Sequence, residues 1–91
     1  MNFKVFIICV ELNNKRAIEN FESSLRQLGE WKIIVPGTYA LKQDFSKTSD
    51  QLKRVLLSKI TPDHKLFIMK SSVDASWVLT ADIDQWLKFN L

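Results

Sequence analysis

The chain of 91 residues has few of the residues that build metal sites, disulfides and phosphate-binding loops. Cysteine and histidine occur once each, as Cys9 and His64, so no internal disulfide can form and a zinc site lacks its several converging ligands. A metal-transport domain needs a Cys-x-x-Cys pair, which is missing too. Two glycines are too few for a loop that cradles phosphate groups. The single cysteine fits a reducing environment, and we expect a cytoplasmic protein.

Long apolar runs and a strong charge of one sign are also missing. The stretch 5–10 is too short to span a bilayer and lacks a signal-peptide cleavage site, so no membrane partner is expected. Thirteen basic and ten acidic residues give a net charge of +3, which permits contact with nucleic acid without requiring it. With 46% apolar residues, 25% charged residues and no linker or repeat, residues 1–91 are predicted to form a single domain.

The first third of the chain predicts a strand followed by a helix. Residues Asn2–Leu12 are apolar on both faces, which is typical of a central strand covered on each side. Asn13 or Asn14 is expected to cap the helix, and Gly29 stands where a helix commonly ends in a left-handed residue. The inward stripe of this helix is predicted to contain Ile18, Phe21, Leu25 and Leu28.

The middle of the chain predicts a hairpin and a second helix. Residues Glu30–Gln43 form two β-prone segments that are separated by Pro36 and Gly37. Thr48, followed three residues later by Gln51, is a capping-box pattern. The inward stripe of the second helix is predicted to contain Leu52, Val55, Leu56, Lys59 and Ile60.

The last third predicts a fourth strand and a short third helix. Pro62 ends the second helix, and residues 64–71 are apolar on both faces of a strand. Asp82 and Asp84 open a helix after Thr80, with one apolar side made of Ile83, Trp86 and Leu87. The order strand, helix, strand, strand, helix, strand predicts an α+β, ferredoxin-like βαββαβ fold, with two helices on one face of a four-stranded antiparallel sheet and a short C-terminal helix.

This arrangement leaves one face of the sheet without its two main helices. Because the first and fourth strands are apolar on both faces, the bare face would be a large exposed apolar surface, which monomers rarely have. The terminal helix can cover part of that face, and a second copy packed sheet against sheet can cover all of it. We therefore predict a homodimer with an isologous interface.

Four segments, taken in order, resemble one known family. "FIICVELN" is similar to the first strand of the small CRISPR-associated Cas-two-like proteins and their SinR-like relatives. "LGEWKIIVPGTYALK" is similar to their hairpin, "DHKLFIMKSSVDASW" to their last core strand and the segment after it, and "WLKFNL" to their closing segment. The resemblance covers nearly the whole chain and implies a ferredoxin-like fold, a homodimer and nucleic-acid binding.

Glu11 is the candidate catalytic and metal-binding residue. The resemblance implies that some members are metal-dependent nucleases that use an aspartate at the end of the first strand, whereas others are structural partners of an integrase. Glu11 stands at the matching position, and its extra methylene moves the carboxylate outward, which disfavours the octahedral geometry of Mg²⁺. Two Glu11 carboxylates across a dimer axis could hold one Mg²⁺ as a cofactor. Alternatively, Glu11 marks the place where the strand reaches water.

Lys15 and Arg16 are the candidate nucleic-acid-binding residues. They open the first helix, where free amides favour an anion, although ordinary exposure to solvent is the alternative interpretation. Cys9 is interpreted as a small core residue. His64 has no partner residue in the sequence that would indicate a functional site. Tryptophans can stack on bases, but packing against the core is the simpler interpretation for Trp31, Trp77 and Trp86.

Three functions are consistent with these residues. The first is a homodimer that binds nucleic acid or acts as a scaffold in nucleic-acid processing. The second is a Mg²⁺-dependent endoribonuclease with paired Glu11 carboxylates, and the third is a regulatory or toxin-type interaction module. An RNA-recognition motif is excluded because "TYALKQ" lacks its Lys/Arg-Gly-Phe/Tyr pattern.

Overall fold

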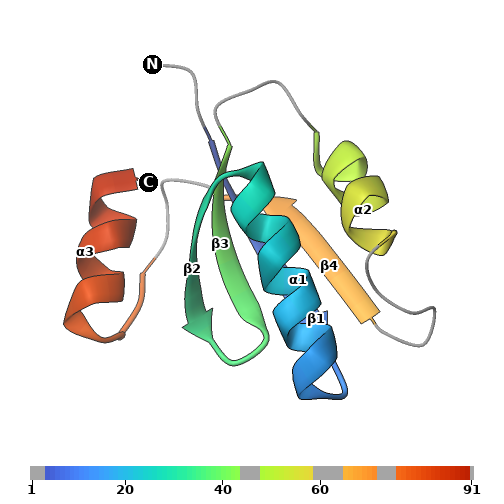
Figure 1. The fold of residues 1–91 in the computed structure, drawn as a ribbon. Coiled ribbons are helices and arrows are strands. Elements are labelled where there is room, and N and C mark those ends of the chain that lie inside the picture. The colour runs from blue at the N-terminus through green and yellow to red at the C-terminus, as the bar shows by residue number, and fades with distance from the viewer. Residues whose placement is uncertain (1–3, 44–47, 59–64, 72–75, 91) are drawn as a thin grey trace.

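A four-stranded sheet carries three helices in the part of the chain that the computed structural model describes, residues 4–43, 48–58, 65–71 and 76–90 (Figure 1). The elements in chain order are β1 (Lys4–Glu11), α1 (Lys15–Leu28), β2 (Glu30–Val35), β3 (Thr38–Gln43), α2 (Ser49–Leu57), β4 (Lys65–Lys70) and α3 (Ala81–Asn90). This order confirms the predicted α+β class. Several positions used in the predictions lie outside the described residues: Asn2, Lys59, Ile60, Pro62 and His64.

The strands lie in the order β2-β3-β1-β4, and every neighbouring pair is antiparallel. β1 is a central strand, as predicted, because Ile8 stands opposite Tyr39 of β3 on one side and Ile68 of β4 on the other. The topology agrees with a ferredoxin-like βαββαβ fold that is extended by a C-terminal helix.

Helices α1 and α2 cover one face of the sheet, which we call the first face. The buried core beneath them contains Phe6, Ile8, Val10, Phe21, Leu25, Tyr39, Leu41, Leu52 and Leu56. Each fully buried side chain of this kind contributes about 1.5–3 kcal/mol, so this cluster dominates the stability of the fold. Two inward positions were predicted wrongly: Ile18 and Val55 are each 37% exposed, because each lies at the edge of the stripe that its helix buries.

Tyr39 brings a polar group into this core. Its hydroxyl donates a hydrogen bond of 2.8 Å to Glu22 Oε2, and its ring contacts Phe21 and Trp31 at centroid distances of 5.4 and 5.7 Å. Burial, followed by the hydrogen bond to Glu22, raises the pKa of Tyr39 far above its usual range. The hydroxyl therefore stays protonated and remains a donor at neutral pH. Half-buried Trp31 packs against this core, as the sequence analysis predicts for a packing residue.

The predicted helix starts are confirmed by their caps. Asn14 Oδ1 accepts the Ala17 N–H at 2.8 Å. At the start of α2, Gln51 N–H donates to Thr48 Oγ1 at 3.2 Å, and Thr48 N–H donates to Gln51 Oε1 at 2.8 Å. Each bond satisfies an amide that the helix itself leaves free.

The end of α1 differs from the prediction. Gly29 has a φ of 165°, which is extended backbone and not the left-handed conformation. Glycine is needed here for a steric reason, since a Cβ at this position would overlap the carbonyl oxygen of Lys42. On the same side, the buried amide of Gln43 donates to the Leu28 carbonyl, which would otherwise lack an intrahelical partner. Helix α1 is thus joined closely to β3.

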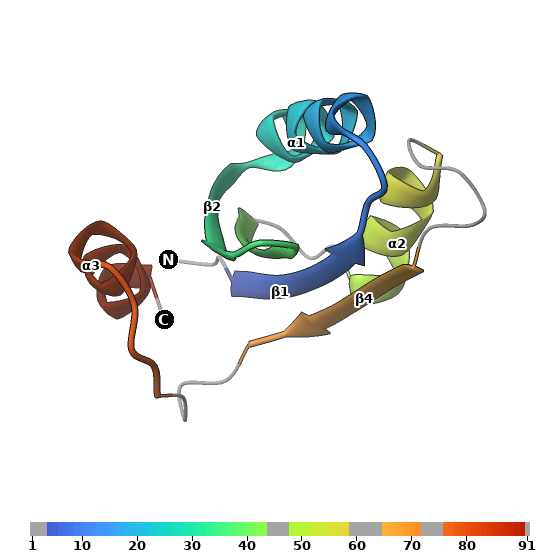
Figure 2. The ribbon, with the colours of Figure 1, turned by 90° about the horizontal axis from the view of Figure 1, so that it is seen from below.

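Helix α3 covers part of the opposite face, which we call the second face. Figure 2 shows α1 above the sheet and α3 beside β2. Trp86 and Leu87 of α3 pack on Val5 and Ala40 of the sheet. Trp86 Nε1–H donates to Glu30 Oε2 at 2.8 Å, which ties α3 to β2. The apolar side that the sequence predicts for this helix is therefore confirmed.

A second hydrogen bond fixes the segment that leads into α3. Trp77 Nε1–H donates to Asp84 Oδ1 at 2.8 Å. This hydrogen bond, followed by Lys88, lowers the pKa of the Asp84 carboxyl. Because the lowered pKa favours the ionised form in the folded state, the ionised carboxylate stabilises α3 at neutral pH, and this stabilisation disappears as the pH falls through that pKa. Trp77 and Trp86 both act as packing residues in the structure.

The close approach at Gly29 predicts the sign of one substitution. Gly→Ala at a relaxed position stabilises a protein by about 0.4–1 kcal/mol through the unfolded state. At Gly29 the added methyl group meets the Lys42 carbonyl, so Gly29→Ala is expected to lower the free energy of unfolding by about 1–3 kcal/mol. Urea unfolding measures the change, with exposed Ser23→Ala on α1 as the control. A more stable Gly29→Ala variant would contradict the steric explanation.

Candidate functional site

The part of the second face that α3 leaves uncovered is apolar. Four side chains of β1 and β4 lie there or at its border, and we call them the open patch: Ile7, which also packs against the α3 cluster, and Cys9, Phe67 and Met69. Phe67 is 58% and Met69 is 47% exposed. Ile7 and Cys9 are half-buried, so the interpretation of Cys9 as a core residue is wrong. Contiguous exposed apolar side chains of this kind mark interaction surfaces more often than plain solvent contact.

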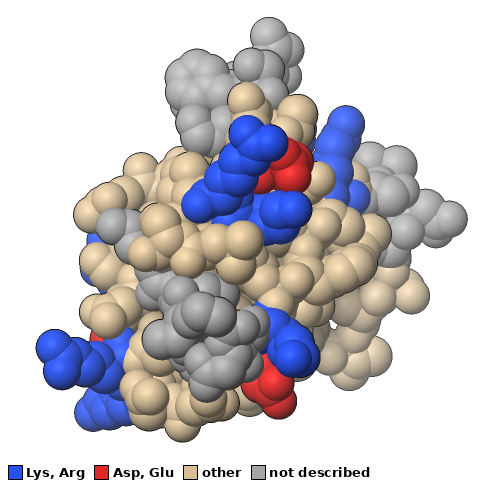
Figure 3. All heavy atoms as spheres, turned by 90° about the vertical axis from the view of Figure 1, so that its right-hand side faces the viewer, with Lys and Arg blue, Asp and Glu red and all other residues tan. Residues whose placement is uncertain are grey.

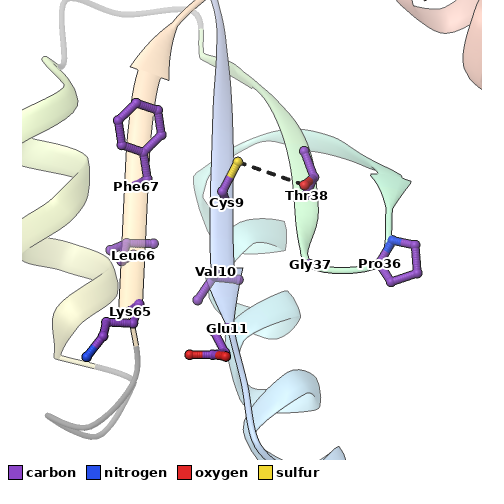
Figure 4. A pocket seen from close by; sticks show the side chains of 9 residues that line it. All are labelled: Cys9, Val10, Glu11, Pro36, Gly37, Thr38, Lys65, Leu66 and Phe67. Carbon is purple, nitrogen blue, oxygen red and sulfur yellow. Dashed lines mark hydrogen bonds between the residues drawn. The ribbon is translucent and has the colours of Figure 1, made fainter.

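A hollow of about 400 Å³ lies at one end of the open patch. Its lining comes from the end of β1, the β2–β3 turn and the start of β4: Cys9, Val10, Glu11, Pro36, Gly37, Thr38, Lys65, Leu66 and Phe67 (Figure 4). Gly37 has a φ of 82°, as a tight turn requires, and its carbonyl accepts the Val10 N–H at 2.8 Å. The turn is therefore held against β1 and gives the hollow one fixed wall.

Glu11 is the last residue of β1 and is exposed beside this hollow. Lys65, the first residue of β4, stands directly opposite Glu11 in the strand register. Figure 4 shows the two side chains at the same end of neighbouring strands. Among the described residues, no hydrogen bond or ion pair joins Glu11 to another side chain. Its carboxylate is therefore available to a group that comes from outside the chain.

Glu11 also belongs to the second face. Side chains alternate along a strand, so Glu11 points to the same face as Cys9 and Ile7. Any molecule that covers the open patch therefore meets this carboxylate at its border. The described residues contain no cluster of three or more side chains able to hold a metal ion. A metal on Glu11 would need further ligands from another molecule, which agrees with the dependence on dimer symmetry inferred from the sequence.

Two pairs of adjacent basic residues, one on α1 and one on α2, differ in their surroundings. Lys53 and Arg54 on α2 share Asp50, with distances of 3.2 and 3.0 Å, and these contacts lower the pKa of Asp50. Lys15 and Arg16 are exposed at the start of α1, whose first turn has no acidic residue. Neither makes an ion pair within the described part of the chain. The pair at the start of α1 is therefore the better candidate for binding an anion.

The described basic residues form separate groups on the side where β4 and α2 lie. Figure 3 shows the Lys and Arg of the described part of the chain on this side in more than one group rather than in one stripe. Broad electrostatic attraction of nucleic acid needs clustered positive charge. Contact with a phosphate backbone would therefore depend on a few local positions rather than on the whole side.

The sequence alone pointed to Glu11, Lys15 and Arg16 but not to the position of Lys65. The signal was present, because in an antiparallel pair the last residue of β1 meets the first residue of β4. The boundary of β4 could not be fixed well enough from its sequence to establish this register. The register Glu11–Lys65 is a finding of the structure.

Comparisons with protein-family models, with curated proteins and with solved structures find no match to this chain. Every helix among the described residues is too short or too polar to cross a lipid bilayer. The functional argument therefore depends on the geometry described above and on the resemblance of the sequence segments.

Proposed function

We propose that the protein is a homodimer that binds nucleic acid, in the manner of the Cas-two-like and SinR-like proteins that its sequence resembles. The observation that carries this proposal is the exposure of Phe67 and Met69 on a sheet face that α3 covers only in part. A scaffold role in nucleic-acid processing follows more directly than catalysis, because the described residues of one copy offer no complete metal site.

A second copy is the partner that fits the open patch best. The surface is a sheet face, and a second sheet of the same kind packs on it with a spacing of about 10 Å. An isologous contact uses the same patch twice, so the exposed Phe67 and Met69 of both copies are covered in one step. Such a dimer covers an apolar surface of the second face that the described helices leave exposed.

Nucleic-acid binding is supported by Lys15 and Arg16. Both are exposed next to the free amides at the start of α1, and no acid lies in that first turn. A phosphate group is the anion that such a site suits best in a basic protein. A dimer carries this pair twice, which doubles the number of phosphates that it can contact.

A Mg²⁺-dependent endoribonuclease is the second candidate function. It is supported by the exposed Glu11 carboxylate, which has no partner among the described residues. Two such carboxylates, one from each copy, could hold a cation that activates water. This function requires a dimer axis that passes close to Glu11.

The dimer is tested by removing the most exposed side chain of the open patch. Phe67→Ser is expected to raise the dimer dissociation constant by at least about tenfold, because a central aromatic anchor is removed. Sedimentation equilibrium measures the constant. Phe89→Ser is the matched control, since Phe89 is also exposed but lies on α3, next to β2. A wild-type protein that is monomeric throughout the micromolar range would contradict the proposal.

The nucleic-acid site is tested with single-stranded RNA and duplex DNA over a series of salt concentrations. The double variant Lys15→Ala, Arg16→Ala is expected to weaken binding and to reduce the salt slope by about one unit for each phosphate that the variant no longer binds. Lys53→Ala, Arg54→Ala is the control with the same change in charge, and it should bind nearly as the wild type does. Absence of salt-dependent binding by the wild type would leave only an interaction module.

Catalysis is tested by incubating the same nucleic acids with and without Mg²⁺. A ribonuclease would cleave RNA only with the metal, and Glu11→Gln would abolish cleavage while leaving the fold intact, because Glu11 is exposed. Product analysis on a denaturing gel provides the readout. Binding without cleavage by the wild-type protein supports the scaffold role instead.

A further inference from the structure

Three pairs of facing residues define the chemistry of the open patch and its border. In the register between β1 and β4, Ile7 stands opposite Met69, Cys9 opposite Phe67, and Glu11 opposite Lys65. All six side chains belong to the second face. Two of the pairs join unlike partners, a small side chain with a large one and an acid with a base. Across a suitable twofold axis, these unlike pairs become complementary contacts between two copies.

Consider a twofold axis that runs parallel to the strands, midway between β1 and β4, in the plane between two stacked sheets. The rotation brings β1 of one copy over β4 of the other. Within one copy, each residue of β1 pairs with one residue of β4. In the dimer, the β1 residue faces that same β4 residue of the second copy. Glu11 faces the partner's Lys65, and Cys9 faces the partner's Phe67. The opposite charges and unlike sizes become complementary across the interface, and each contact occurs twice.

The main alternative places the axis along β1, so that the two Glu11 carboxylates face each other. That axis would lay the partner's β4 over β3. However, Ala40 on the second face of β3 is fully buried in one cluster with Trp86 and Leu87 of α3. On β1 this cluster contains Val5, at the end of the strand away from Glu11, so the Cys9–Glu11 end of β1 stays open to the partner's β4. The partner's strand would collide with α3, and the two carboxylates would also repel each other in a partly desolvated contact. The position of α3 therefore moves the axis away from β1, towards β4.

We propose that the second copy packs on the open patch in the first of these registers, with Glu11 of each copy paired with the partner's Lys65. In this arrangement Phe67 fills the space above the partner's Cys9, beside the hollow at the end of the patch. Glu11 then determines the register of the dimer and is not half of a paired metal site. This inference rests on the proposed homodimer. It adds that the charges of Glu11 and Lys65, at the border of the open patch, determine how the two copies align.

Charge reversal tests this register. Glu11→Lys alone and Lys65→Glu alone each place like charges at both symmetry-related contacts, so each should raise the dimer dissociation constant by about tenfold or more. An equimolar mixture of the two variants restores opposite charges at both contacts. Sedimentation equilibrium of the mixture should therefore show a heterodimer close to wild-type affinity. This recovery also shows that both variant chains are folded.

A control pair separates the local contact from the change in net charge. Glu19→Lys and Arg26→Glu make the same changes in charge at exposed positions of α1, on the other side of the sheet. Alone or mixed, they should leave the dimer near wild-type affinity. If this control mixture gained affinity as much as the test mixture did, the ion-pair register would be overturned.

The remaining outcomes distinguish the inference from the proposed function. A wild-type dimer that tolerates Glu11→Lys and Lys65→Glu equally well would overturn the register while the homodimer stands. Insensitivity of the dimer to Lys65→Glu alone, combined with metal-dependent cleavage that requires Glu11, would favour the axis along β1. A wild-type protein without a dimer at any concentration would overturn both.

Discussion

The constraint on which this structure depends is that its sheet has two apolar faces, and its described helices cover the first face and only part of the second. Helices α1 and α2 cover the first face over the largest buried cluster of the described residues. On the second face, α3 covers Val5 and Ala40 but leaves Phe67 and Met69 exposed. Burial of apolar surface is the main favourable contribution to folding and association, so the uncovered part is where a partner gains the most. The position of α3 thus decides where a partner can bind.

That position is fixed by a small number of directed contacts. The indole N–H of Trp86 donates to Glu30 on β2, and that of Trp77 donates to Asp84 within the C-terminal segment. Buried aromatic side chains supply most of the contact area, while their N–H groups determine orientation. Next to Glu30 in the chain, the overlap that excludes a Cβ at Gly29 and the Gln43 amide together join α1 to β3. These contacts leave β4 and the Cys9–Glu11 end of β1 as the accessible part of the second face.

The role open to Glu11 depends on the partial cover of the second face by α3. It ends β1 on the second face, opposite Lys65 and beside a hollow whose wall is the Gly37 turn. A lone exposed carboxylate has no chemistry of its own at neutral pH without a base, a metal or a counter-ion placed nearby. In the proposed homodimer, the position of the twofold axis would decide whether Glu11 meets a second carboxylate or a lysine, and α3 would limit where that axis can lie.

The element order, the central position of β1 and both helix caps were predictable from the sequence, because they depend on local patterns of apolar, capping and turn residues. Glu11, Lys15 and Arg16 were likewise identified as candidates from their positions at the ends of elements. The tertiary structure alone decided that Gly29 is required by the nearby Lys42 carbonyl and not by a left-handed φ. It also decided that α3 covers only part of the second face and that Glu11 stands opposite Lys65. These features depend on contacts between residues far apart in the chain, which local periodicity does not encode.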